Sequence, residues 1–380
     1  MFKLGIDNID NYMDLFKGKR VGLITNPTGM TSSYQSTIDF LKEKVNLVAL
    51  FSPEHGVRGH LQAGVRFDTY IDEESGIPVY SLYTSTKRPS KEMMDQLDIL
   101  CIDIQDAGSR FYTFIYTMAY AMMSCKEFDK DFVVFDRPNP VNSYDYEGNI
   151  LDLEYRSFVG YYPILQRHGM TIAELAKLFN EEYGIGCRLH LVLMEDFDRK
   201  KYLDELNTMW VIPSPNLPTV TTAVVYNATC VFEGTNISEG RGTTLPFELV
   251  GAPFINGLEL ANKLNSMGFE GVYFRRYYFT PTFAKYKDEL CQGVQVHVTD
   301  RSKFKPVHVS WAMVDVIRKM YPNDFKINKP YKEGAHCMFQ FETGCNYIME
   351  DKYTLEEQFE ILDKETKEFG EIRKKYLLYK

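Results

Sequence analysis

Three short apolar runs each end in a cluster of polar and charged residues, and this pattern constrains the fold more than any other feature. The runs cover residues 47–51, 99–102 and 132–135, and the polar clusters that follow cover 52–59, 103–110 and 136–140. Strands this uniformly apolar are buried on both faces, as in parallel sheets. Ligands bind at the carboxyl ends of strands in such sheets. We therefore expect the three clusters to form one site.

Helical segments alternate with these runs and predict a Rossmann-like parallel sheet. A strand at 21–25 and a helix at 32–44 precede them, and helices follow at 111–128 and from Thr171 to about 183. Thr171 and Glu174 form a capping-box pattern, and a further strand is expected at 188–193. Such an α/β order places helices on both faces of the sheet. No G-x-G-x-x-G motif follows any strand, so the dinucleotide fingerprint is missing and a nicotinamide cofactor is not expected.

The length of the chain favours two domains. Its 380 residues exceed the usual size of one domain. A proline-rich loop at 211–218 indicates an approaching boundary, which we place near Asn227. We therefore expect a Rossmann-like catalytic domain at 1–226 and a smaller C-terminal α/β domain at 227–380. In the second domain we expect a strand at 293–298, a final amphipathic helix, and a glycine-rich segment that completes the cleft.

Charge and composition exclude several classes of function. The net charge is −9 and the densest basic runs are triplets at 199–201 and 373–375, so nucleic-acid binding is not expected. No apolar stretch approaches the roughly 20 residues of a membrane helix, so membrane insertion is not expected either. The seven cysteines lie far apart without C-x-x-C spacing. They indicate reduced core residues and no zinc site.

Glu54 and His55 are the first catalytic candidates. Both lie in the turn after the first apolar run. Partial burial there would raise the pKa of the Glu54 carboxyl, which suits a general acid. The alternative for Glu54 is a carboxylate that caps a helix or braces the loop. His55 would orient Glu54 or contact substrate, and its alternative is donation to a backbone carbonyl within the turn.

The other two clusters supply further candidates. Asp103 and Asp106 are the catalytic candidates of the second cluster, and Arg110 is a binding candidate. An Asp–Arg brace is the alternative for one such pair. The third cluster, Asp136 to Pro140, forms a rigid strand exit that presents its polar groups, with a structural turn as the alternative. Tyr80 and Tyr83 would form a stacking wall for a sugar or simply pack.

The glycine-rich segment at 232–243 carries Glu233, Glu239 and Arg241. Glycines there allow the backbone to approach a ligand closely. The segment lacks the lysine of a P-loop, so a phosphate cradle is not expected. The full set of candidate substrate-binding residues is Arg58, Tyr83, Arg110, Asp136, Arg137, Asn139, Glu233, Glu239 and Arg241.

Six motifs taken together resemble a bacterial family of exo-acting β-N-acetylmuramidases. The motifs cover residues 53–56, 103–112, 136–140, 168–171, 214–218 and 232–243, in order along nearly the whole chain. The resemblance implies two domains with the active site between them, and release of N-acetylmuramic acid from the non-reducing end of peptidoglycan fragments. It also implies that no metal or organic cofactor is needed, and that Glu54 is the catalytic acid.

The resemblance favours a periplasmic or cell-envelope location, with the cytoplasm as the alternative, because many relatives carry an export signal and this chain has no such apolar run at its N-terminus. The expected partner is a small glycan or muropeptide. The sequence does not assign an oligomeric state.

Cleavage of a glycosidic bond usually needs a second carboxyl group. The candidates for it are Asp103, Asp106, Asp136, Glu233 and Glu239, and the acetamido group of the substrate is a further alternative.

The lactyl carboxylate that distinguishes N-acetylmuramic acid from N-acetylglucosamine needs a cation. Four arginines lie on the motif loops, of which we favour the first and last: Arg58, Arg110, Arg137 and Arg241. Two other functions stay open. One is a metal-dependent phosphohydrolase that uses Asp103, Asp106 and His55, and the other is a sugar-binding protein without catalysis.

Overall fold

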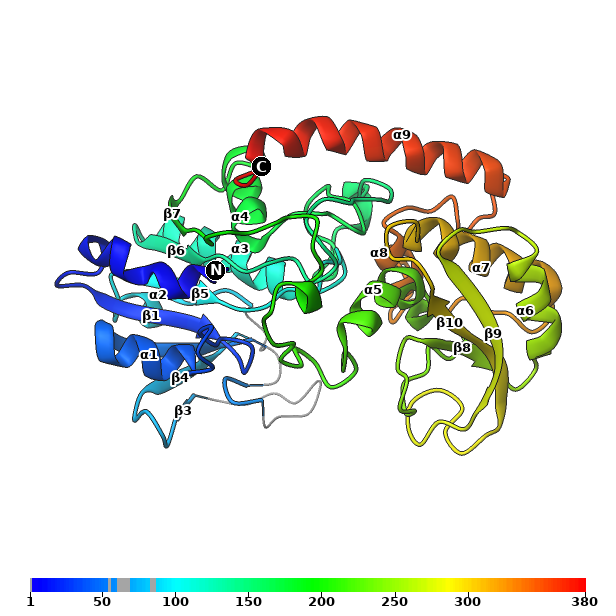
Figure 1. The fold of residues 1–380 in the computed structure, drawn as a ribbon, viewed down its shortest axis with the longest axis horizontal. Helices are drawn as coiled ribbons and strands as arrows, with labels where there is room; N and C mark the ends of the chain where they lie inside the picture. Colours follow the sequence, from blue (N-terminus) through cyan, green and yellow to red (C-terminus); the bar gives the residue numbers. More distant parts are fainter. Residues whose placement is uncertain (1, 54–55, 60–68, 83–86) are drawn as a thin grey trace.

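The structure, a computed structural model, describes residues 2–53, 56–59, 69–82 and 87–380. These residues form an N-terminal unit around a seven-stranded sheet and a C-terminal unit around a three-stranded sheet (Figure 1). The predicted fold class, a Rossmann-like sheet domain followed by a smaller α/β unit, is confirmed.

The large sheet is parallel except at one edge. Only the β3–β4 pair at that edge is antiparallel among the strands described. In spatial order the strands are β3 (Tyr70–Ile71), β4 (Pro78–Ser81), β2 (Asn46–Ser52), β1 (Arg20–Thr25), β5 (Ile99–Asp103), β6 (Asp131–Phe135) and β7 (Arg188–Val192). The carboxyl ends of the six parallel strands point toward the C-terminal unit (Figure 1).

Each face of this sheet has its own core, which explains the uniformly apolar strands. In β5, Leu100 and Ile102 pack with α3 and α4, whereas Ile99 and Cys101 pack with η1 and α1 on the other face. The helical elements of this unit are η1 (Gly5–Leu15), α1 (Thr37–Lys44), α2 (Lys91–Met94), α3 (Phe114–Glu127), η2 (Leu153–Tyr155), α4 (Ile172–Glu181) and η3 (Leu203–Glu205).

Two helix starts show how local chemistry sets the boundaries. The capping box of α4 is confirmed, because Thr171 Oγ1 accepts from Glu174 N at 3.2 Å and Glu174 accepts from Thr171 N at 3.1 Å. The helix predicted from residue 32 begins later, at Thr37. The Ser36 hydroxyl accepts from Ile38 N at 3.2 Å and thereby caps α1.

The C-terminal unit packs helices on an antiparallel sheet in the order β8 (Leu249–Ala252), β10 (Cys291–Val298), β9 (Val272–Phe279). Its helical elements are α5 (Val220–Thr229), η4 (Cys230–Gly234), α6 (Gly257–Asn265), α7 (Pro306–Met320), α8 (Met338–Thr343), α9 (Leu355–Arg373) and η5 (Lys374–Tyr376). The predicted strand at 293–298 is part of β10. The predicted boundary at 226/227 falls inside α5, and its exact position stays a prediction.

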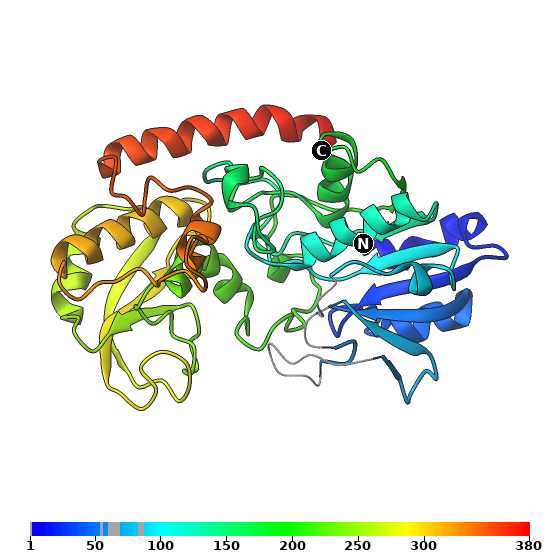
Figure 2. The same cartoon turned by 180° about the vertical axis from the view of Figure 1, so that it is seen from behind.

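The last helix connects the two units. α9 runs across both of them in two opposite views (Figures 1 and 2). Leu362 joins the core of the C-terminal unit, and Phe369 joins that of the N-terminal unit. Beyond the helix, Tyr379 Oη donates to Asp136 Oδ2 at 2.6 Å. The end of the chain is therefore anchored on the first unit.

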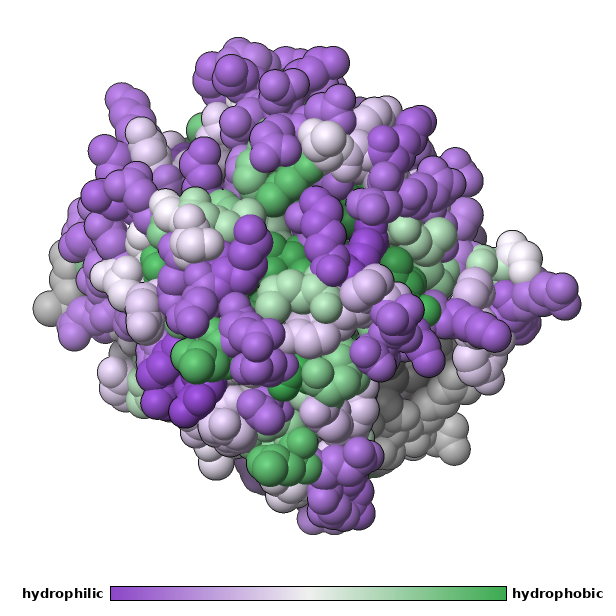
Figure 3. Space-filling model, turned by 90° about the vertical axis from the view of Figure 1, so that its right-hand side faces the viewer, coloured by the Kyte–Doolittle hydropathy of each residue, from purple (hydrophilic) through white to green (hydrophobic). Residues whose placement is uncertain are grey.

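The outer end of the C-terminal unit has a mainly hydrophilic surface, with apolar side chains showing between the polar ones (Figure 3). Among the helices of the described residues, none has both the length and the apolar character of a membrane span.

Candidate active site between the two units

The strand ends bring the predicted clusters to one edge of the large sheet. Ser52 ends β2 and Asp103 ends β5, with β1 between them in the sheet. Glu54, His55 and Tyr83 lie outside the described residues, so their assigned roles stay predictions. Tyr80 is described, and its hydroxyl donates to Gln96 at 2.9 Å.

A cavity of about 170 Å³ lies where the N-terminal unit meets the C-terminal unit. Three of the motif segments line it. The segment after β5 contributes aromatic residues, the 214–218 loop contributes polar groups, and the glycine-rich segment contributes a carboxyl and a guanidinium group. The lining residues are Phe111, Tyr112, Thr113, Phe114, Val159, Ser214, Asn216, Leu217, Tyr226, Glu233, Arg241 and Phe247.

The charged wall of this cavity comes from the C-terminal unit. Arg241 Nη2 forms an ion pair with Glu233 Oε1. Gly240 and Gly242 flank Arg241 with φ angles of 80° and 83°, a left-handed conformation that favours glycine. The glycines noted in the sequence therefore shape the loop that presents this arginine.

Glu239 is not among the residues that line the cavity, but it contacts Arg241, which does. Its side chain is buried, and Oε2 accepts from Lys285 Nζ at 2.9 Å. Its other oxygen, Oε1, lies 3.7 Å from Arg241 Nε. Glu239 therefore helps hold Arg241 and Lys285 in place.

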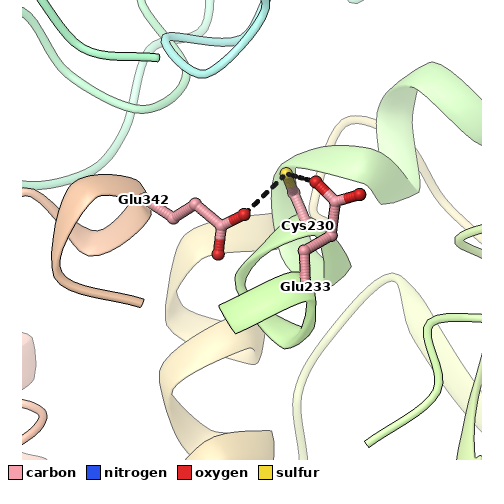
Figure 4. A group of neighbouring side chains, drawn as sticks. All are labelled: Cys230, Glu233 and Glu342. Carbon is pink, nitrogen blue, oxygen red and sulfur yellow. Dashed lines mark hydrogen bonds between the residues drawn. The ribbon is translucent and has the colours of Figure 1, made fainter. Parts of the chain in front are cut away.

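Cys230 lies between two carboxyl groups (Figure 4). Its Sγ is 3.6 Å from Glu233 Oε2 and 4.0 Å from Glu342 Oε1. Burial raises the pKa of Glu233 against the opposing charge of Arg241. Burial, and then the charge of Glu233, raises the pKa of Glu342 well above its ordinary value. These groups form an acidic cluster that favours a retained proton.

The same three side chains have the spacing of metal ligands. The sulfur and one oxygen of each carboxyl all lie within 4.8 Å of one another. Arg241 and Lys285 already supply positive charge to this cluster. Their presence reduces the electrostatic attraction for a cation.

Asp103 and Arg137 form a buried pair at the strand ends. Arg137 Nε lies 2.5 Å from Asp103 Oδ1, and Nη2 lies 2.8 Å from Oδ2. Thr37 Oγ1 also donates to Oδ2. Both carboxylate oxygens are thus bonded within the protein. This geometry is that of the Asp–Arg brace, the alternative to a role in contact with substrate.

Asp106 is held by its neighbours through one oxygen. Its Oδ2 accepts from Gly108 N at 2.9 Å and lies 3.1 Å from His168 Nε2. The buried Oδ1 has no hydrogen-bond partner among the described residues. Asp106 and the His168 motif therefore meet at the strand ends.

Besides Arg137, two more of the candidate arginines form hydrogen bonds with protein groups. Arg58 donates from Nε and Nη2 to both oxygens of Asp72, at 3.1 and 2.8 Å. Arg110 is fully buried and donates to four main-chain carbonyls, those of Asn149, Ile164, Glu342 and Thr343. Burial lowers the pKa of Arg110 to about 10. Through the bonds to Glu342 and Thr343, Arg110 links the N-terminal unit to α8.

Asp136 and Asn139 stabilise the strand exit. Asp136 Oδ1 accepts from the backbone of Arg137 and Ala173, each at 2.9 Å, at the start of α4. Burial raises the pKa of Asp136 to about 7. Asn139 donates to the Met170 carbonyl at 3.1 Å and accepts from Val141 N at 3.1 Å. These contacts match the alternative of a structural turn.

Sequence reasoning missed Glu342 and Lys285 and treated Cys230 as a plain core cysteine. Lys285 and Glu342 lie about 40 and 100 residues beyond the glycine-rich segment, and no local motif marks either of them. They meet Glu233 and Glu239 only through the packing of α8 and the 280–290 loop on η4. A single-sequence pattern carries no signal for such a contact.

Comparisons with known proteins match the chain to one family over nearly its whole length. Family profiles described as the N-terminal and C-terminal parts of the exo-β-N-acetylmuramidase NamZ match residues 21–221 and 224–379. The chain is 50% identical over 381 residues to the peptidoglycan β-N-acetylmuramidase NamZ of Bacillus subtilis (strain 168), covering 99% of this chain and 91% of that protein.

Two crystal structures of DUF1343 family proteins from Bacteroides fragilis NCTC 9343 share the fold. One matches with a TM-score of 0.90 and 36% identity, covering 100% of this chain and 99% of the other. The second has a TM-score of 0.80 and 31% identity over the same shares of the chains. By these matches and by the six motifs, the chain belongs to the NamZ family of exo-β-N-acetylmuramidases.

Proposed function

We propose that this protein is an exo-acting glycosidase that releases N-acetylmuramic acid from the non-reducing end of peptidoglycan fragments. The observation that carries the proposal is the match to the Bacillus subtilis enzyme over 99% of the chain. The cavity between the units supports it, because three of the family-like motifs meet there and supply aromatic, hydroxyl, carboxyl and guanidinium groups.

The reaction is hydrolysis of a β-glycosidic bond. The leaving oxygen receives a proton as its bond to the anomeric carbon breaks, and water supplies the hydroxyl group that replaces it. Glu54 is the proposed proton donor. The anomeric carbon becomes positively charged in the transition state, so a nearby carboxylate lowers the barrier.

Arg241 is the proposed partner of the lactyl carboxylate. Among the four arginines on the motif loops, Arg58 and Arg137 are bonded to aspartates. Arg110 is bonded to carbonyls. Arg241 lines the cavity and is one-third exposed. A guanidinium has five N–H donors, so donors remain beyond the pair with Glu233.

The phosphohydrolase alternative finds less support. It requires Asp103 as a metal ligand, whereas both Asp103 oxygens are bonded to Arg137. The sugar-binding alternative uses the same cavity and differs only in the absence of turnover.

The test is incubation of the protein with a β-linked N-acetylmuramyl-N-acetylglucosamine disaccharide, with and without EDTA. We expect free N-acetylmuramic acid, detected by mass spectrometry, at equal rates in both reactions. Loss of activity in EDTA would indicate the metal-dependent enzyme, and binding without turnover would indicate the sugar-binding protein. A longer oligosaccharide labelled at its reducing end distinguishes exo cleavage, which removes one terminal sugar at a time, from endo cleavage.

We also propose the cell envelope as the working location, because the proposed substrate is derived from peptidoglycan. Fractionation of cells that express the native gene, followed by immunodetection, tests this location against the cytoplasm.

A further inference from the structure

The five acidic candidates for the second carboxyl group differ in whether a substrate can reach them. Asp103 and Asp136 have no exposed surface, and both oxygens of each accept hydrogen bonds from the protein. Asp106 and Glu239 are also buried. Glu233 lines the cavity, and its side chain is 25% exposed. Of the five, Glu233 is the group that a substrate in the cavity can reach.

The charges around Glu233 do not balance if every acid is ionised. Arg241 pairs with Glu233, and Lys285 pairs with Glu239. Glu342 is 2% exposed, and its Oε2 has no hydrogen-bond partner among the described residues. An unpaired buried carboxylate is strongly disfavoured, whereas a neutral carboxylic acid is tolerated. The cluster is therefore expected to retain one proton at neutral pH, on Glu342.

Among the described residues, the titratable and charged groups that face Glu233 and Glu342 are consistent with this assignment. Cys230 lies between them, and its thiol is neutral because burial raises the thiol pKa well above its ordinary value. The hydroxyl of Tyr226 is neutral for the same reason. The remaining charged neighbours are Glu239, Arg241 and Lys285.

We infer that Glu233 is the second carboxyl group of the reaction and acts as a carboxylate, and that Glu342 is a positioning residue that holds the proton of the cluster. This inference rests on the proposed glycosidase function. Glu233 stabilises the positive charge that develops at the anomeric carbon. Because Glu342 is neutral, it adds no negative charge behind Glu233, and Glu233 stays ionised beside Arg241.

Turnover tests the role of Glu233. On the N-acetylmuramyl disaccharide, Glu233→Gln is expected to lose about 10²–10³-fold in kcat, because the charge in the site is removed while the shape is kept. Glu360→Gln is the matched control, since Glu360 is exposed on α9, and it is expected to match the wild type. Turnover of Glu233→Gln at the control level would overturn the inference. If thermal melting shows this variant unfolded, Glu233→Ala replaces it, because it also removes the carboxylate, and wild-type turnover of that variant would overturn the inference equally.

Infrared spectroscopy tests the proton on Glu342. At neutral pH, the difference spectrum between wild type and Glu342→Gln should show loss of the carbonyl band of a neutral carboxylic acid. The Glu360→Gln difference spectrum should show no such loss. The acid limb of the pH profile of kcat is a second test of the proton on Glu342. It should keep its position in Glu342→Gln, since glutamine resembles a neutral acid.

Two results would mean that Glu342 is ionised and would overturn the inference. One is an acid limb of the kcat profile that moves to lower pH in Glu342→Gln. The other is a difference spectrum in which only a carboxylate band is lost. Failure of the proposed function is a separate result. In that case the wild type itself would release no N-acetylmuramic acid from the disaccharide, while the infrared result would stand.

Discussion

Arg137 and Asp103 form a two-point ion pair beneath the carboxyl edge of the large sheet, with atom pairs 2.5 and 2.8 Å apart. The same guanidinium donates from Nη2 to the Met30 carbonyl at 2.7 Å. Thr37, the first residue of α1, also donates to the carboxylate. The pair therefore ties β5, the exit of β6 and the loop before α1 into one frame.

Asp103→Asn is expected to reduce the free energy of unfolding by about 3–5 kcal/mol, because the buried Arg137 charge would lose its counterion. Chemical denaturation followed by circular dichroism measures this change. Asp98→Asn, at an exposed pair with Arg20, is the control and is expected to cost at most about 1 kcal/mol. Equal stability of the two variants would contradict the role of Asp103 as a structural brace.

Asp136 makes stability depend on pH. Burial raises its pKa from 3.8 to about 7. Because the folded protein holds this proton more tightly than the unfolded chain, the contribution of Asp136 is fully present below about pH 4 and is lost as pH rises through 7. The difference between the two pKa values corresponds to roughly 4 kcal/mol.

Asp136→Asn should therefore remove much of the loss of unfolding free energy between about pH 4 and 7. The hydroxyls of Thr171 and Tyr379 can turn to accept from the new amide. Denaturation series at four pH values compare the variant with the wild type. Parallel curves for the two proteins would show that folding does not raise the pKa of Asp136.

Arg241→Lys should reduce the preference for an N-acetylmuramide over the matched N-acetylglucosaminide. A charge-assisted hydrogen bond contributes about 1.5–3 kcal/mol, which corresponds to a loss of roughly ten- to hundredfold in the ratio of kcat/KM values. Lysine cannot reproduce two parallel donors. Arg58→Lys is the control, because Arg58 is bonded to Asp72. An unchanged ratio in Arg241→Lys at low salt would remove Arg241 from recognition of the lactyl group.

Glu54→Gln should fold normally and lose about 10²–10⁴-fold in turnover, because the amide cannot give a proton to the leaving oxygen. The assay needs a substrate with a poor leaving group, such as the natural disaccharide. A nitrophenyl glycoside needs little protonation and would conceal the defect. Near-normal turnover on the disaccharide would exclude Glu54 as the acid.

The positions of the central strands along the chain, and their burial, could be predicted from the sequence. Apolar runs such as 99–102 have no polar face, so they can lie only between two layers of helices, and both layers are present. The capping box at Thr171 and Glu174 was equally predictable, because both partners lie within one helical turn. Chemistry within a few residues decides such features.

The tertiary structure decides which charged groups remain available to a substrate. Arg110 and Arg241 both lie on motif loops, yet the first is buried against carbonyls of α8 and the second lines the cavity. Glu342 lies beside Glu233, with more than one hundred residues of chain between them. A side chain's partners depend on which distant segments pack against it, and long-range packing sets burial and charge pairing. Local pattern in one sequence therefore marks candidate residues but cannot assign their roles.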